Sequence, residues 1–87
     1  MEARQMNFMV KLENITRSGN KITCTIFVED AEQGFYAEYD CESNTMSDVV
    51  LPEGYEWCRS HIAQARYFLK SLIDKEAIPS RKTIMWY

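Results

Sequence analysis

The first half of the chain alternates apolar and polar side chains, and this pattern limits the possible folds more than any other feature of the sequence. Three segments alternate in this way: residues 6–14, 21–29 and 35–42. A period of two places every second side chain on one face of a β-strand, so each segment is predicted to be a half-buried strand. The predicted inward-facing residues are Met6, Phe8, Val10, Leu12, Ile22, Cys24, Ile26, Val28, Phe35, Ala37, Tyr39 and Cys41.

The turns between these segments predict how the strands pair. Residues 31–34 are predicted to join the second and third segments as a hairpin. That hairpin would pair Val28 with Ala37, Ile26 with Tyr39 and Cys24 with Cys41. In the first hairpin, the inward residues of both segments carry even residue numbers. They share one face only if the two residue numbers of each cross-strand pair add up to an even value. A loop of three residues at 18–20 gives an even sum and usually carries a bulge, so we predict it in preference to a two-residue turn.

The second half of the chain changes to a helical period. Apolar residues recur there three or four positions apart, which predicts a helix over residues 53–76 after an irregular stretch at 43–51. Pro52 and Glu53 suit a first helical turn, and Pro79 is predicted to end the helix. The stripe predicted to face the sheet consists of Cys58, Ile62, Ala65, Leu69 and Leu72.

These elements predict an α+β fold in a single globular domain of residues 1–87, a three-stranded antiparallel meander with one long C-terminal helix packed on one face. The last residues, 81–87, are strand-like. They are compatible with a fourth short strand, giving the order βββαβ, or with a segment that lies along the helix of a βββα fold. No linker or low-complexity stretch divides the chain.

Charge and cysteine content indicate where such a protein works. The chain has 10 Lys+Arg and 13 Asp+Glu, a formal net charge of −3, which argues against a dedicated nucleic-acid binder. No run approaches the roughly 20 apolar residues of a membrane-spanning helix, and the N-terminal residues do not resemble a signal peptide. Three cysteines are an odd number, which favours reduced thiols. We therefore expect a soluble cytoplasmic protein that does not bind membranes.

The cysteines and the single histidine form the most suggestive chemical set. Cys24, Cys41, Cys58 and His61 could converge as a Cys₃His zinc site, but buried cysteines also pack as small hydrophobic residues. Cys24 opposite Cys41 is compatible with a disulfide, and Cys58 with His61 is compatible with a nucleophile and base that lack an orienting third residue. We predict no metal, no cofactor and no catalytic residues.

Basic residues gather towards the C-terminus. A nucleic-acid site would use them on phosphates and a tyrosine for stacking, whereas a solvated helix flank needs no ligand. Binding to nucleic acid is therefore the alternative function. Its candidate residues are Arg59, Arg66, Tyr67, Lys70, Arg81 and Lys82.

The chain also has more apolar residues than one sheet and one helix need to bury. The surplus is predicted on the outer face of the sheet and in the C-terminal segment. Exposed apolar patches and unpaired strand edges are common partner sites, and small domains often gain stability by dimerising. The leading hypothesis is a non-enzymatic module that binds a protein partner or forms a homodimer. Its candidate contact residues are Met9, Phe27, Tyr36, Ile84, Met85, Trp86 and Tyr87.

Overall fold

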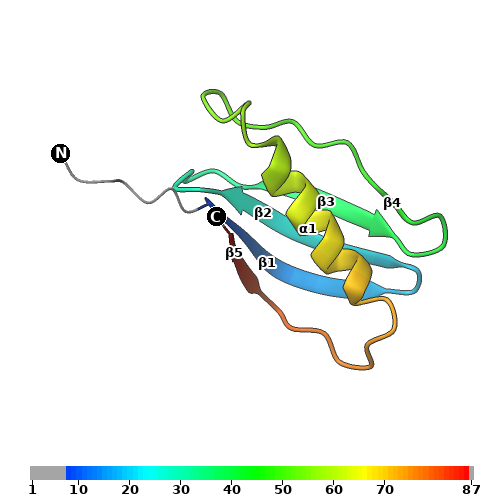
Figure 1. The fold of residues 1–87 in the computed structure, drawn as a ribbon. Coiled ribbons are helices and arrows are strands. Elements are labelled where there is room, and N and C mark those ends of the chain that lie inside the picture. Colours follow the sequence, from blue (N-terminus) through cyan, green and yellow to red (C-terminus); the bar gives the residue numbers. More distant parts are fainter. Residues whose placement is uncertain (1–7, 87) are drawn as a thin grey trace.

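A computed structural model describes residues 8–86, in which one antiparallel sheet of five strands carries a single helix on one face (Figure 1). The elements in chain order are β1 (Phe8–Ser18), β2 (Lys21–Val28), β3 (Phe35–Asp40), β4 (Thr45–Met46), α1 (Arg59–Ser71) and β5 (Lys82–Trp86). The strand order in the sheet is β4-β3-β2-β1-β5. The predicted α+β meander with one helix is confirmed.

The C-terminal segment is a strand of the sheet and does not lie along the helix. β5 pairs antiparallel with β1, so that Phe8 faces Trp86, Val10 faces Ile84 and Leu12 faces Lys82. At the opposite edge, β4 adds two residues beside β3 in the stretch that was expected to be irregular. The sheet therefore ends on one side in a full strand and on the other side in a fragment.

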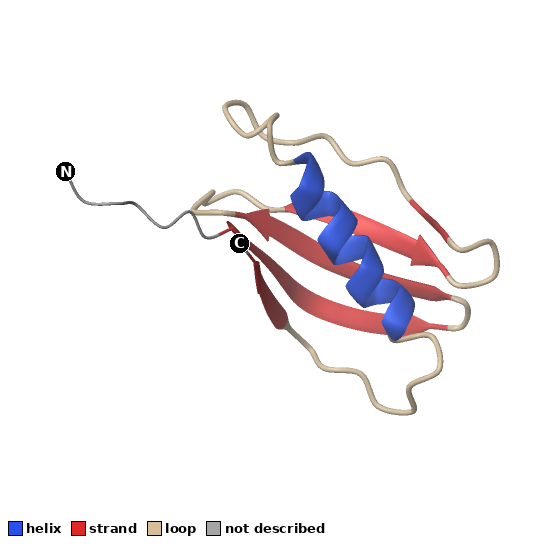
Figure 2. Ribbon diagram, viewed as in Figure 1, coloured by secondary structure: helices blue, strands red, loops and turns tan. Residues whose placement is uncertain are grey.

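Figure 2 shows α1 crossing one face of the sheet, and the buried side chains of both elements form the core between them. The strands contribute Val10, Leu12, Ile15, Ile22, Cys24, Ile26, Val28, Ala37 and Tyr39 to it. The helix side contributes Cys58, His61, Ala65, Leu69 and Leu72. The predicted helix stripe was wrong at one position, because His61 is fully buried where Ile62 was expected and Ile62 is only half-buried.

The first hairpin contains a bulge inside β1 and not at its turn. Val10 pairs with Val28, and their residue numbers add up to an even value as predicted. Ser18, however, pairs with Lys21 across a two-residue turn. The predicted three-residue loop was therefore wrong. The register changes between residues 13 and 16, where Asn14 adopts a φ of +54°. This extra residue turns Ile15 into the core, and asparagine tolerates the left-handed conformation better than most residues.

The register between β2 and β3 differs from the prediction by four residues. Ile26 pairs with Phe35 and Cys24 pairs with Ala37, so a longer connection links the two strands. A shift by an even number leaves the same side chains inward, so the predicted core face was right although the pairs were wrong. Cys24 does not face Cys41, and the predicted cross-strand cysteine pair does not form.

The helix is shorter than residues 53–76 at both ends. The backbone N–H groups of Tyr55 and Cys58 each donate to the carbonyl three residues earlier, which makes turns of residues 52–58. Gly54 has a φ of +90°, a conformation that a right-handed helix does not contain. The N–H groups of residues 72, 73 and 75 also bond three residues back, so α1 ends in tight turns well before Pro79.

Candidate interaction edge and the His61 cluster

The backbone groups of β5 point alternately towards the sheet and away from it. Met9 accepts a hydrogen bond of 3.0 Å from the residue after β2, so its backbone polar groups face β2 and those of Val10 face β5. Val10 pairs with Ile84, which therefore directs its N–H and C=O to β1. The N–H and C=O groups of Thr83 and Met85 consequently point away from the sheet, where residues 8–86 place no further strand.

The two edges of the sheet differ in how easily another strand could join. β4 contains two residues and runs into irregular chain, which blunts that edge. β5 has five residues without Pro, Gly or a bulge, so its outer backbone groups form a regular row. A regular, unpaired edge strand is a template for pairing with another chain.

The predicted partner-binding residues divide between the two faces of the sheet. Met9, Phe27, Tyr36 and Met85 lie on the face that α1 leaves open, and Met85 is 63% exposed. Ile84 and Trp86 instead lie on the helix side and pack partly buried against the core. Tyr87 lies outside the described residues.

The open face carries an ion pair near the β1–β2 turn. Lys21 Nζ lies 2.9 Å from Glu38 Oε2, and the Tyr36 hydroxyl donates to Glu38 Oε1 at 3.2 Å. The hydrogen bond from Lys21, and next that from Tyr36, lowers the pKa of the Glu38 carboxyl. The hydrogen bond to Glu38 raises the pKa of Lys21. This ion pair is solvated, because the Lys21 and Glu38 side chains are 54% and 33% exposed.

A buried histidine joins the helix to the end of β2. Nε2 of the fully buried His61 lies 2.5 Å from Oε2 of Glu29. The same carboxylate oxygen accepts a hydrogen bond of 2.9 Å from the backbone N–H of Met9. Nδ1 of His61 is buried and has no hydrogen-bond partner among residues 8–86. Glu29 thus orients the imidazole and connects it to β1.

Glu29 holds this position in an unfavourable backbone conformation. Its φ is +52°, and the left-handed region costs a residue other than glycine about 1–2 kcal/mol. This conformation ends β2 and directs the carboxylate under the helix. Sequence reasoning missed Glu29, because one acidic residue after an apolar strand gives no sign of a buried partner.

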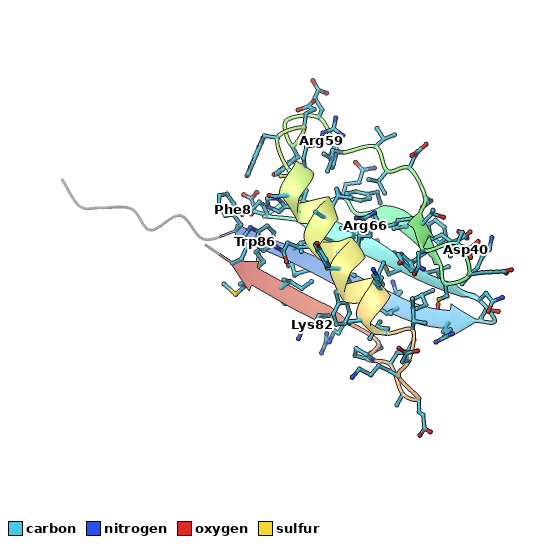
Figure 3. The ribbon with its side chains drawn as sticks, turned by 45° about the vertical axis from the view of Figure 1, so that its right-hand side comes forward. Phe8, Asp40, Arg59, Arg66, Lys82 and Trp86 are labelled. Atoms are coloured by element: carbon cyan, nitrogen blue, oxygen red, sulfur yellow. The ribbon has the colours of Figure 1, made fainter. Side chains whose placement is uncertain are left out.

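Three aromatic rings surround His61. Its ring centroid lies 4.8 Å from that of Trp86, 5.5 Å from that of Trp57 and 5.8 Å from that of Phe8. Phe8 and Trp86 also stack on each other at 5.8 Å, and Figure 3 shows them together where β1 begins and β5 ends. We call Phe8, Glu29, Trp57, His61 and Trp86 the His61 cluster. It fixes the end of β5 against β1 and the start of α1.

The cysteines do not join His61 in a common site. Among residues 8–86, no three His, Cys, Asp or Glu side chains are grouped as metal ligands would be. Burial raises the pKa of the Cys24 thiol to about 12. Burial, and next the charge of Glu29, raises the pKa of Cys58. Since Nδ1 of His61 has no partner in the described chain, Cys58 included, the geometry shows no activated thiol.

The basic candidates lie on two sides of the helix. Arg59, Arg66 and Lys70 follow the flank of α1 that faces β3 and β4, where Arg66 and Lys70 line a shallow pocket with Tyr39 and the exposed Tyr67. Arg81 and Lys82 line a different pocket beside β1. Figure 3 shows Arg59 and Arg66 apart from Lys82. The six nucleic-acid candidates therefore do not form one continuous surface.

Comparisons with known proteins give no family for the chain. No protein-family model, curated protein or solved structure matches it. Within residues 8–86, no helix has the length and apolar character required to cross a membrane.

Proposed function

We propose that the protein is a non-enzymatic binding module of the cytoplasm that recognises an extended protein segment by adding it as a strand beside β5. The observation that carries this proposal is the outward direction of the N–H and C=O groups of Thr83 and Met85 on a regular edge strand. An added strand would satisfy these groups and cover the exposed side chain of Met85. The free state of all three cysteines supports a reducing compartment.

The His61 cluster supports the same edge. An edge strand that binds a partner must itself be held in place, because ordering it on binding would cost free energy. Trp86 is anchored on His61 and Phe8, and Ile84 packs against the core. β5 is therefore a preorganised template.

Strand addition is testable with isotope-labelled protein and a panel of extended peptides that alternate apolar and polar residues. At a dilution where the chain is monomeric, we expect the largest amide shift changes at Thr83 and Met85. Met85→Pro removes an outward N–H without removing a bond to β1, so it should abolish the response. Val50→Pro, at an exposed residue outside the sheet, is the matched control and should respond like the wild type. Shift changes centred on α1, or an unchanged response of Met85→Pro, would contradict strand addition.

Binding of a polyanion on α1 is the second candidate. It is supported by Arg59, Arg66 and Lys70, none of which forms an ion pair with a carboxylate among residues 8–86. Binding through phosphates must weaken steeply as salt increases. Titration with mixed oligonucleotides at two salt concentrations tests this candidate, and Arg66→Gln should weaken binding. An affinity that does not depend on salt would reject it.

A further inference from the structure

We infer that the strand added to β5 is β5 of a second copy, antiparallel to the first, with a two-fold axis midway between the two Ile84 residues. This inference rests on the proposed use of the β5 edge and names its partner. It would produce one continuous sheet from two copies.

The outward backbone groups of β5 complement themselves. Thr83 and Met85 lie one residue on either side of Ile84 and both direct N–H and C=O away from β1. With the axis at Ile84, Thr83 of one copy faces Met85 of the other, and each such pair exchanges two hydrogen bonds. The outward polar groups of Thr83 and Met85 are then all satisfied, four hydrogen bonds in total by the antiparallel pattern.

The side chains of β5 also tolerate this pairing. Ile84 would contact Ile84 of the second copy on the helix side, where it is already partly buried. Lys82 would face Trp86 of the second copy, so the two lysines do not oppose each other. Lys82 Nζ lies 5.7 Å from the ring centroid of Phe68 in α1 of its own copy, so its ammonium has a cation–π contact within each copy. On the open face, Met85 would be covered by Thr83.

The other edge of the sheet explains why assembly would stop at two copies. β4 has only two residues, so β5 is the one edge among the described strands that offers a regular row of backbone groups. A two-fold contact uses the same edge of both copies and leaves no second β5 exposed. The arrangement therefore closes as a dimer and does not extend into a fibre.

Single cysteines on β5 test both the partner and the position of the axis. In the full chain, Ile84→Cys places the new thiol opposite itself at a non-hydrogen-bonded pair, where Cα atoms are about 4.5 Å apart and a disulfide can form. We expect Ile84→Cys to become a covalent dimer on mild oxidation. Thr83→Cys and Met85→Cys alone should not, whereas a mixture of these two variants should cross-link. The native cysteines should contribute little to this cross-linking, since Cys24 and Cys58 are buried and Cys41 is half-buried.

Sedimentation of the unmodified chain completes the test. The wild type should sediment as a dimer, and Met85→Pro should weaken the dimer about tenfold or more through the loss of one hydrogen bond at each of two symmetric sites. Thr83→Pro is the second variant if Met85→Pro does not fold. A monomeric wild type with no Ile84→Cys cross-link overturns the second copy as partner, while peptide binding at β5 would still support the proposed function. Preferential cross-linking of Thr83→Cys or Met85→Cys with itself overturns the axis at Ile84.

Discussion

His61 Nε2 lies 2.5 Å from Glu29 Oε2, and this contact connects four elements at one end of the sheet. Glu29 ends β2 and accepts a hydrogen bond from Met9 of β1, while His61 belongs to α1 and packs on Trp86 of β5. The proposed binding edge thus depends on a buried polar contact beneath it. A change in this contact is expected to reach β5 even though Glu29 lies two strands away.

Glu29→Ala is expected to lower the free energy of unfolding by about 1–3 kcal/mol, since it leaves the backbone N–H of Met9 and a buried ring nitrogen of His61 without their acceptor. Alanine retains the strain of the positive φ, so no relief offsets this loss. Urea denaturation measures the change. Glu32→Ala, at an exposed residue of the adjacent loop, should stay within about 0.5 kcal/mol of the wild type. Equal stabilities of the two variants would show that the contact contributes nothing.

Asn14→Val is expected to destabilise the chain by about 1–2 kcal/mol, because a β-branched residue is poorly accommodated at a φ of +54°. Asn14→Gly should be neutral or slightly stabilising, since glycine adopts this conformation without a steric penalty. Thermal unfolding of both variants checks the prediction. If valine were as stable as glycine at this position, the bulge would not lie at residue 14.

The alternating residues of the first half predicted the strands and the inward face because side-chain period alone determines which face a residue occupies. The partners of each strand could not be derived in the same way. The shift of four residues between β2 and β3 leaves the inward set unchanged, so the pattern contains no information that distinguishes the two registers. Similarly, the bulge at Asn14 and the predicted three-residue loop both give cross-strand pairs such as Val10 with Val28, so the pattern does not distinguish a bulge inside β1 from one at the turn.

The candidate edge was partly predictable and the His61 cluster was not. The sequence predicts a strand at residues 82–86. Which of their N–H and C=O groups point away from the sheet, however, depends on the pairing with β1. His61 was expected beside the apolar stripe on the inner side of the helix, where a lone histidine usually makes one hydrogen bond, but its partner could not be derived from the sequence. Its burial depends on Glu29, Phe8 and Trp86, which are distant in sequence.

Gly34→Ala is expected to destabilise the sheet by about 1–3 kcal/mol. A Cβ at this residue would lie 2.7 Å from Thr25 Cγ2 and 2.8 Å from Phe27 Cε2 and Cζ. The threonine methyl group sits on a stiff branched side chain and cannot easily move away. Chemical denaturation should also show that Thr25→Ser, which removes that methyl group, recovers part of the loss in the double variant. Additive effects of the two substitutions would contradict a direct clash.

The pKa of Cys24 predicts how stability changes in alkali. The folded state raises this pKa from 9.0 to about 12, because burial disfavours the thiolate. The contribution of the protonated, buried Cys24 thiol to the free energy of unfolding is fully present below pH 9. It is lost as the pH rises towards 12, at about 1.4 kcal/mol per pH unit for one proton. Denaturation at pH 8 and pH 10 should therefore show a steeper loss in the wild type than in Cys24→Ala. Parallel pH dependences would mean that Cys24 is accessible in the folded chain.

Hydrogen exchange of the β5 amides, followed as a function of protein concentration, tests the account most directly. At high dilution Ile84 should exchange slowly, through its bond to Val10, while Thr83 and Met85 exchange quickly. As the concentration rises, Thr83 and Met85 should become protected while Ile84 changes little. Fast exchange of Thr83 and Met85 at every concentration, with and without extended peptides, would show that the β5 edge is not the binding surface.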